Sequence, residues 1–301
     1  MSASIVDALL KRMLRVNTTD PSEAYFVDGA SPPGSDHAAI HSTIYAALVG
    51  VADGNPFLAS QLSAYLIRRD LGPSSCMTGK WVLEACYRLA LFDPDGYAAD
   101  YALHLLSRST YPSWGYMIKI GATLSLEAWR PEDKWNTDWG HPWCASPAYA
   151  IPRLMLGAQP LEPGWTRFRI APQPSTLAHI TARLPTPLGT LGINYTAVAD
   201  DGVVESAGGE VRLDVHVPSG THGQVCLVLW TNIDVDRDNG GSSEKFMGYK
   251  KRKIARNDAT SVIVLTVDGK EVAQEPWGRM TCTQTDIGAG AHSIVLALSQ
   301  L

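Results

Sequence analysis

The first half of the chain predicts helices, because its apolar residues recur every three to four positions. About seven segments share this spacing: residues 5–16, 37–51, 56–71, 77–92, 97–109, 116–129 and 147–156. Turn-forming residues separate neighbouring segments, as in Asn55-Pro56 and in the stretch from Asp93 to Gly96. The pattern therefore indicates a helical N-terminal half.

Beyond Pro160 apolar and polar residues alternate, a period that is typical of strands. The alternating runs are TRFRIAP, HITARLP, GTLGINYTAV, EVRLDVHV, QVCLVLW, SVIVLTV and HSIVLAL. Turns rich in Gly, Pro and Asp divide these runs, so we expect an antiparallel β-sandwich. The period changes in GAQPLEPGW, residues 157–165. We therefore predict an α+β protein of two domains, with a helical domain over 1–160 and a β-sandwich domain over 161–301.

The composition is that of a folded protein with room for two hydrophobic cores. The chain has 301 residues, of which 45% are hydrophobic and 18% are charged. A net charge of −5 gives no reason to expect a nucleic-acid partner. No apolar run approaches the roughly 18 residues that a membrane span needs, so we expect no membrane partner.

The cysteines and the N-terminal residues predict a cytoplasmic location. The 5 cysteines are an odd number without a close pair, which is typical of free thiols in a reducing compartment. The start, MSASIVDALL, lacks the basic region and the long apolar region of a secretory signal.

Residues 111–143 hold the densest candidate chemistry of the chain. Five tryptophans gather there, and Glu127 and His141 lie among them: Trp114, Trp129, Trp135, Trp139 and Trp143. Indole rings suit a site that stacks on sugars or on flat organic ligands. A carboxylate among such rings loses solvation, so we expect the pKa of Glu127 to be raised. The alternative is a core helix whose tryptophans simply pack.

We expect Glu127 to point into a pocket that Trp114, Trp129 and at least one of the other three tryptophans line. In the predicted helix over 116–129, Thr123 and Glu127 lie one turn apart on the same face. Tyr116 and Met117 follow Trp114 and are expected to form the wall of the cleft. His141 is expected to reach the same cavity, where it orients a ligand or exchanges a proton. The alternative for His141 is that it fixes the loop between Trp139 and Trp143.

Several consecutive motifs resemble those of the inverting α-L-rhamnosidases. The strongest are TLSLEAW (123–129), NTDWGHPW (136–143) and ASPAYAIPRLMLG (145–157). The similarity continues through PLEPGW, RIAPQP and LPTPLGTL, and it weakens after about residue 200. Upstream, VDG, HAAIHS and LLSRSTYPSWGYMI occur in the order that the family has. The resemblance therefore covers nearly the whole chain.

This resemblance implies a fold and roles for particular residues. It implies a partial (α/α) toroid followed by the family's C-terminal β-sandwich. Glu127 matches the position of the general base, the histidine that His141 matches contacts the sugar, and Asp28 is placed near the cleft. The family's general acid lies on an acidic segment before the VDG motif, and we expect that segment to be absent here. Arg130 and Gly140 also depart from the family's motifs.

An inverting glycosidase needs two carboxyl groups roughly 6.5–9.5 Å apart, one as acid and one as base. Three functions follow. The first is a cofactor-free isomerase or cyclase of natural-product biosynthesis, which uses Glu127 for a dehydration or a cycloaddition. The second is an active α-L-rhamnosidase that takes its acid from Asp28, Asp36 or Asp138. The third is a non-catalytic carbohydrate-binding protein. In each case the partner is a hydrophobic or sugar-like small molecule.

A partial toroid leaves apolar helix faces uncovered, so we expect a homodimer. We expect no cofactor and no metal. His37 and His41 are one helical turn apart but lack a third ligand, and the aspartates of the D-x-D-x-D stretch (Asp234, Asp236 and Asp238) do not match the register of a calcium loop.

Overall fold

The computed structural model describes residues 3–71, 74–94, 96–197, 210–228, 230–232, 252–254 and 261–300. The described residues up to Ala150 form one compact unit, and those from Ile151 onward form a second. The aspartates of the D-x-D-x-D stretch, Asp234, Asp236 and Asp238, lie outside the described residues.

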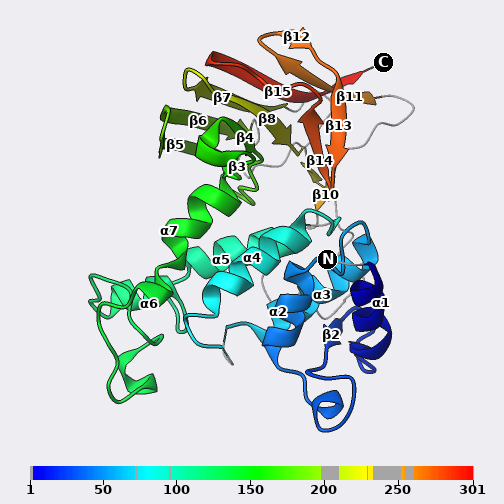
Figure 1. Cartoon of the computed structure of the whole chain (residues 1–301), viewed down its shortest axis with the longest axis vertical. Helices are drawn as coiled ribbons and strands as arrows, with labels where there is room; N and C mark the ends of the chain where they lie inside the picture. The colour runs from blue at the N-terminus through cyan, green and yellow to red at the C-terminus, as the bar shows by residue number, and fades with distance from the viewer. Residues whose placement is uncertain are drawn as a thin grey trace. The chain divides into compact units, whose positions relative to one another are not determined.

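The first unit is built of helices (Figure 1). Its α-helices are α1 (Ala3–Arg12), α2 (Ile40–Leu48), α3 (Pro56–Arg69), α4 (Gly79–Ala90), α5 (Tyr97–Ser107), α6 (Trp114–Lys119) and α7 (Ser146–Ala150). A short antiparallel pair, β1 (Leu14–Val16) with β2 (Ala24–Phe26), accompanies them. The predicted helix over 5–16 therefore ends early, because its last three residues pair as a strand.

Helix α4 lies at the centre of this unit. It contacts α2, α3, α5 and α7, and it buries Val82, Leu83, Cys86, Tyr87 and Leu89. An amphipathic helix gains most of its stability from such burial rather than from its intrinsic propensity. A disulfide from Cys76, just before this helix, joins its N-terminal end to the segment that ends at Cys144.

The predicted helix over 116–129 is wrong beyond its first turns. Helix α6 ends at Lys119, and Gly121 has a φ of 93°, a left-handed conformation that favours glycine. The N–H of Ala122 donates to the carbonyl oxygen of Met117 at 3.0 Å, which closes the helix end. Residues 122–130 form bends and irregular backbone, so Glu127 does not lie on a helix.

The second unit contains two larger sheets (Figure 1). A six-stranded sheet has the order β12-β11-β15-β7-β6-β5, and a five-stranded sheet has the order β13-β14-β8-β4-β3. The strands of the first sheet are β5 (His179–Thr186), β6 (Gly189–Ala197), β7 (Glu210–Val217), β11 (Ser261–Val267), β12 (Lys270–Glu271) and β15 (Gly290–Gln300). Those of the second are β3 (Gln159–Pro160), β4 (Arg167–Ile170), β8 (His222–Leu227), β13 (Gln274–Trp277) and β14 (Met280–Thr283).

The two sheets share one hydrophobic core. Phe168 and Val225 of the second sheet belong to the same buried cluster as Ile193, Leu213 and Leu296 of the first. Buried and less buried residues alternate along β6 and β7, as the sequence predicts. One pair departs from the predicted antiparallel order, because β4 and β8 run parallel. A further short pair, β9 (Trp230–Asn232) with β10 (Arg252–Ile254), stands apart from both sheets.

Disulfides contradict the prediction of five free thiols. Cys76 bonds to Cys144 in the first unit, and Cys226 bonds to Cys282 in the second. Cys86 is free and buried in α4, and burial raises the pKa of its thiol. The sequence missed both pairs because the partners are 68 and 56 residues apart. Since disulfides persist mainly in oxidising compartments, the cysteines no longer support a cytoplasmic location.

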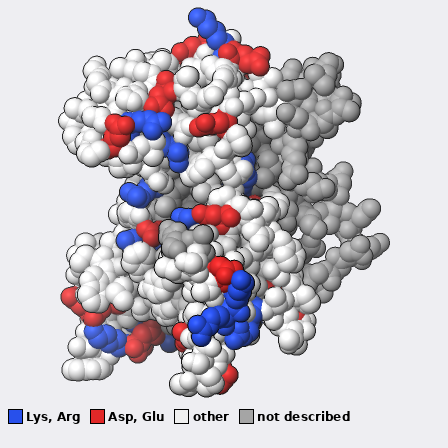
Figure 2. Space-filling model, turned by 45° about the vertical axis from the view of Figure 1, so that its right-hand side comes forward, with Lys and Arg blue, Asp and Glu red and all other residues white. Residues whose placement is uncertain are grey.

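The surface carries both signs of charge. On the face drawn in Figure 2, Lys and Arg side chains lie among Asp and Glu side chains rather than in one field of a single sign. Each helix in the described part of the chain is too short or too polar to span a bilayer.

Candidate functional site

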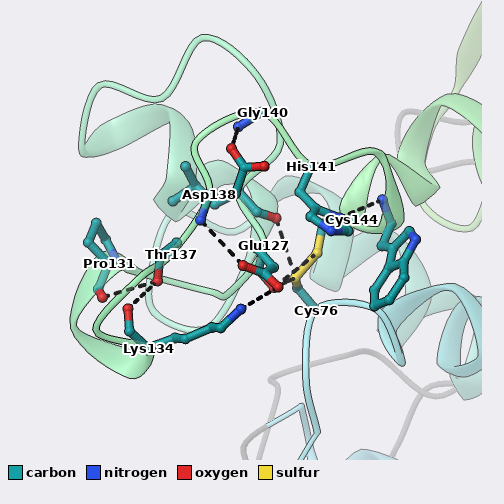
Figure 3. A network of polar contacts seen from close by, with 11 residues as sticks. Cys76, Glu127, Pro131, Lys134, Thr137, Asp138, Gly140, His141 and Cys144 are labelled. Atoms are coloured by element: carbon teal, nitrogen blue, oxygen red, sulfur yellow. Dashed lines mark hydrogen bonds and ion pairs between the residues drawn. A yellow bond between two sulfur atoms is a disulfide. The ribbon is translucent and has the colours of Figure 1, made fainter.

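Glu127 and His141 lie on two backbone stretches that bond to each other. The N–H of Glu127 donates to the carbonyl oxygen of Asp138 at 2.9 Å. The N–H of His141 donates to the carbonyl oxygen of Ser125 at 2.8 Å, and the Ser125 hydroxyl donates to the carbonyl oxygen of His141 at 2.7 Å. Residues 125–127 therefore lie beside residues 138–141 (Figure 3).

The loop between these stretches is closed by its own side chains. The Thr137 hydroxyl donates to the carbonyl oxygens of Lys134 at 2.6 Å and of Pro131 at 3.2 Å. The Arg130 side chain donates to the Asp133 carboxylate at 2.8 Å. These bonds set the path of the chain from Arg130 to Thr137, and they place Lys134 opposite Glu127 (Figure 3).

The Glu127 carboxylate is paired with the ammonium group of Lys134. The N–H of Asp138 is a second, longer donor, at 3.4 Å. The hydrogen bond from Lys134 lowers the pKa of Glu127 below its usual value; the Asp138 amide and the charges of Lys134 and His141 add to this effect, and desolvation opposes it. The Glu127 side chain is 22% exposed.

The expected rise in the pKa of Glu127 is therefore wrong. The tryptophans do not desolvate the carboxylate enough to outweigh a cation in contact with it. Lys134 was not predicted as a site residue. Its position seven residues after Glu127, across a loop that begins with Pro131, was the available signal, but only the folded loop makes the two meet.

A disulfide lies directly beneath the backbone of Glu127. The Sγ atom of Cys76 is 3.0 Å from the carbonyl oxygen of Glu127, and the Sγ atom of Cys144 is 3.7 Å from the same oxygen. Cys76 precedes α4, and Cys144 follows His141. The cross-link therefore ties the segment that carries both candidate residues to the start of the central helix (Figure 3).

Trp114 and Trp129 are buried beneath this segment. Their rings meet edge to face, with centroids 5.1 Å apart. The indole N–H of Trp114 donates to the carbonyl oxygen of Cys144 at 2.7 Å, and that of Trp129 donates to the carbonyl oxygen of Ser74 at 2.9 Å. A Cβ atom at Gly79 would lie 2.8 Å from the Trp114 ring, so glycine makes room for it at the start of α4. Both buried rings thus hold the segment in place through their N–H bonds. Their predicted contact with a ligand stays a prediction.

The other three tryptophans are exposed. Trp135 is 96% exposed, and Trp139 and Trp143 are each at least half exposed. The His141 ring meets the Trp143 ring edge-on at 4.6 Å, and its Nδ1 atom accepts the Trp143 N–H at 3.3 Å. In the neutral imidazole this assigns the proton to Nε2. His141 thus fixes the loop through Nδ1, and its predicted contact with a ligand stays a prediction.

The remaining predicted site residues have other neighbours. Tyr116 packs edge-on against Tyr111, with ring centroids 5.7 Å apart, and Met117 is buried. Asp28 accepts from the Ser42 hydroxyl at 2.6 Å, the Ala39 N–H at 2.9 Å and the His37 ring. The hydrogen bonds from Ser42 and His37 lower the pKa of Asp28 to about 2. These contacts tie Asp28 to the start of α2.

The candidate metal pair does not converge on one point. His37 bonds to Asp28, whereas the Nε2 atom of His41 lies 3.2 Å from the Thr78 hydroxyl. Within the described ranges, no group of three or more His, Cys, Asp or Glu side chains is arranged to hold a metal ion.

Two family models match the chain in succession. Residues 90–155, which include Glu127 and His141, match the bacterial α-L-rhamnosidase six-hairpin glycosidase domain, and residues 157–241 match the bacterial α-L-rhamnosidase C-terminal domain. The chain is rhamnosidase-like. The resemblance inferred from the motifs is thereby confirmed.

Two curated relatives are similar to parts of the chain. The rhamnosidase-like chain is 34% identical over 110 residues to an α-L-rhamnosidase of Alteromonas sp. (strain LOR), which covers 34% of this chain and 12% of the relative. It is 27% identical over 179 residues to an α-L-rhamnosidase of Formosa agariphila, covering 56% of this chain and 18% of the relative. The matches thus span less than a fifth of each relative's length.

A solved structure has a similar fold. The α-L-rhamnosidase from Dictyoglumus thermophilum superposes with a TM-score of 0.62 at 17% sequence identity. The match covers 97% of the rhamnosidase-like chain and 28% of the solved chain. At this identity the similarity concerns the fold alone.

Proposed function

We propose that this rhamnosidase-like chain acts on glycosides through Glu127, as the carboxylate that removes a proton from the attacking water. The observation that carries the proposal is the pairing of Glu127 with Lys134. It keeps the carboxylate ionised and leaves part of it open to solvent. A general base has to be ionised before the reaction, whereas a general acid has to hold a proton.

The same reasoning limits the choice of the acid. Asp28, with a pKa of about 2, is ionised near neutral pH and does not suit the role. The backbone of Asp138 bonds to that of Glu127, and the Asp138 carboxylate accepts from the N–H of Gly140 at 3.0 Å. Asp138 is exposed, and its carboxylate bonds within its own turn. The proposal therefore concerns the base and leaves the identity of the acid open.

We infer that the exposed tryptophans contact the substrate. Trp135, Trp139 and Trp143 present apolar ring faces around the loop that carries Lys134 and His141, and sugar rings stack on such faces. The Nε2–H group of His141 can donate a hydrogen bond to a sugar hydroxyl. The fold similarity to the solved rhamnosidase supports the arrangement expected from the sequence, an arc of an (α/α) toroid followed by a β-sandwich.

No observation favours an isomerase or a cyclase over a glycosidase. That function was expected from a Glu127 with a raised pKa in a pocket lined by tryptophans. The carboxylate instead has a lowered pKa, and three of the five tryptophans are exposed.

The test is hydrolysis of 4-nitrophenyl α-L-rhamnopyranoside by the wild-type chain, by Glu127→Gln and by Glu132→Gln. Glu132 is an exposed acid in the same loop, so Glu132→Gln is the matched control. We expect Glu127→Gln to lower kcat by about 10²–10⁴-fold and the control to leave it unchanged. Added azide should restore turnover in a Glu127→Ala variant, because the anion can attack without a base. Equal turnover in Glu127→Gln and the wild-type chain would overturn the proposal. Rhamnoside binding without turnover in the wild-type chain would indicate the carbohydrate-binding alternative.

A further inference from the structure

The outer face of the six-stranded sheet carries a trough in the second unit. Two adjoining hollows of about 540 and about 380 Å³ share Arg183, Gly192 and His216 in their walls. These residues belong to β5, β6 and β7 and point away from the hydrophobic core, whose side chains occupy the alternate positions. The trough is therefore a feature of the exposed sheet face.

One wall of the trough is a row of polar residues that crosses four strands. The register pairs Thr181 with Asn194, Asn194 with Asp214, and Asp214 with Ser293. The Thr181 hydroxyl donates to the Asn194 side-chain oxygen at 3.0 Å, and the Ser293 hydroxyl donates to the Asp214 carboxylate at 2.7 Å. These bonds hold the Asn194 and Asp214 side chains in fixed orientations before any ligand arrives.

The next row of residues across the same strands contains two small residues, which leave space above the sheet. It pairs Arg183 with Gly192, Gly192 with His216, and His216 with Ala291. Gly192 lowers the floor between Arg183 and His216, and Ala291 lowers it on the other side of His216. A Cβ atom at Gly192 would lie 3.2 Å from that of His216. Glycine weakens the interior of a strand, and it often marks a bulge or a place where a ligand or another backbone approaches closely. The register runs through Gly192 without a bulge, so the missing side chain deepens the surface there without interrupting the sheet.

Polar groups around this floor have bonding capacity to spare. Among the described residues, the Arg183 guanidinium and the His216 ring have no hydrogen-bond or ion-pair partner. The Asn194 amide N–H groups and the second oxygen of Asp214 also have none there. Thr181 bonds to the Asn194 side-chain oxygen, and Ser293 bonds to the first Asp214 carboxylate oxygen. Donors and acceptors thus both face the trough, and the Arg183 and Asp214 charges cancel.

We propose that this trough binds a neutral, polyhydroxylated ligand, a saccharide. A hydroxyl group both donates and accepts, which matches the mixed set that Arg183, Asn194, Asp214 and His216 offer. Arg183 and Asp214 carry opposite charges, and Asp268, which also lines the trough, is paired with His292, so the lining favours neither sign of charge in a ligand. The residues that line the trough include imidazoles but no indole, phenol or phenyl ring, so the affinity is weak. The proposal does not depend on the function of Glu127, which lies in the other unit.

The test is residue-resolved NMR on the full chain, with methyl α-L-rhamnopyranoside, methyl α-D-glucopyranoside and methyl α-D-galactopyranoside as neutral probes. Glucuronate and glucosamine serve as charged comparisons. We expect at least one neutral glycoside to shift the amide signals of Gly192, Asn194, Asp214 and His216 more than either charged sugar does.

The variants Asp214→Asn and Arg183→Met should each weaken this response about tenfold, the effect of losing a charge-assisted hydrogen bond. Asp214→Asn keeps the acceptor for Ser293. The matched control is Arg212→Met, on the same face of β7 outside the trough, where Arg212 pairs with Glu210. The proposal is overturned if no neutral glycoside shifts the trough amides, if a charged sugar shifts them more, or if Asp214→Asn and Arg183→Met respond like the control. Shifts confined to residues 125–143 would support the proposed function and overturn this one.

Discussion

At the scale of the residue, the charge state of Glu127 depends on one neighbour. The sequence identifies this glutamate through its motif, but an isolated motif says nothing about which cation lies beside it. Lys134 approaches because the loop from Arg130 to Thr137 turns back on itself. The carboxylate is then stabilised in its ionised form, which is the form that a base requires.

Replacing Lys134 by Met should raise the pKa of Glu127. The lysine favours the ionised carboxylate, so its loss shifts the titration of Glu127 to higher pH. Any activity that needs the ionised carboxylate should then begin to fall at a correspondingly higher pH as the solution is acidified. The measurement is the side-chain carboxyl carbon shift of Glu127 in NMR spectra recorded across the acid range. Lys119→Met, at the exposed end of α6, is the control. A Glu127 titration that is identical in Lys134→Met and the wild-type chain would show that the pair does not form in solution.

His141 permits a separation of its two predicted roles. His141→Ala removes both the acceptor for the Trp143 N–H and the Nε2 group, whereas the side-chain oxygen of His141→Asn replaces the acceptor alone. If Nε2 binds the ligand, both variants should weaken rhamnoside binding about tenfold or more, as expected for a lost hydrogen bond to a bound sugar. The measurement is titration calorimetry with methyl α-L-rhamnopyranoside. Wild-type affinity in His141→Asn together with a loss in His141→Ala would leave only the loop-fixing role.

At the scale of the element, periodicity predicted elements well where burial is regular. The run EVRLDVHV coincides with β7, and the helices over 56–71 and 97–109 are correct to within two residues. It failed at 116–129, where apolar residues recur at helical spacing but Gly121 stops the helix. The backbone of 125–127 instead bonds to 138–141, a partner that no local pattern reveals. The short strands β3, β12, β13 and β14 were missed because two to four residues carry too little pattern.

The start of α2 depends on Asp28, eleven residues before Ala39. Asp28→Asn should lower the free energy of unfolding at neutral pH by about 1 kcal/mol, less than the full pKa shift implies because the carboxylate is partly solvated. The folded-state pKa of about 2 lies below the value of 3.8 expected for an unperturbed aspartate. The stabilisation is therefore fully present above about pH 4 and is lost as the pH falls towards 2.

Urea unfolding of Asp28→Asn and of the wild-type chain at neutral and acid pH measures this difference. Asp7→Asn, which breaks an exposed helix pair with Lys11, is the control and should change stability little at either pH. A difference between Asp28→Asn and the wild-type chain that grows as the pH falls would contradict the assigned role.

At the scale of the whole molecule, the chain consists of two compact units, and each has its own disulfide. The change of hydrophobic period predicts a boundary after residue 160, and the compact units divide between Ala150 and Ile151. The sequence could not predict the cross-links, since each joins cysteines that only the fold brings together. The homodimer expected from uncovered helix faces stays a prediction, which light scattering on the purified chain can measure.

The two cross-links should stabilise the two units separately. Cys76–Cys144 and Cys226–Cys282 close segments of 68 and 56 residues, and cross-links of this span typically contribute about 2–4 kcal/mol by restricting the unfolded chain. Calorimetry of the oxidised protein should resolve two unfolding transitions. Replacing Cys76 and Cys144 by Ser should lower one of them, and replacing Cys226 and Cys282 by Ala should lower the other. Cys86→Ala leaves both disulfides in place, so it is the control. A reductant should still lower both of its unfolding transitions.

The two pairs should also differ in their effect on the site. Because the Cys76–Cys144 bridge lies under the Glu127 carbonyl oxygen, its loss frees the segment that carries Glu127 and His141 from the start of α4. Rhamnoside binding or turnover should therefore fall with the first pair of substitutions and persist with the second, at a temperature where both variants are folded. Equal effects of the two pairs on the site would mean that the bridge acts through global stability alone and does not position Glu127.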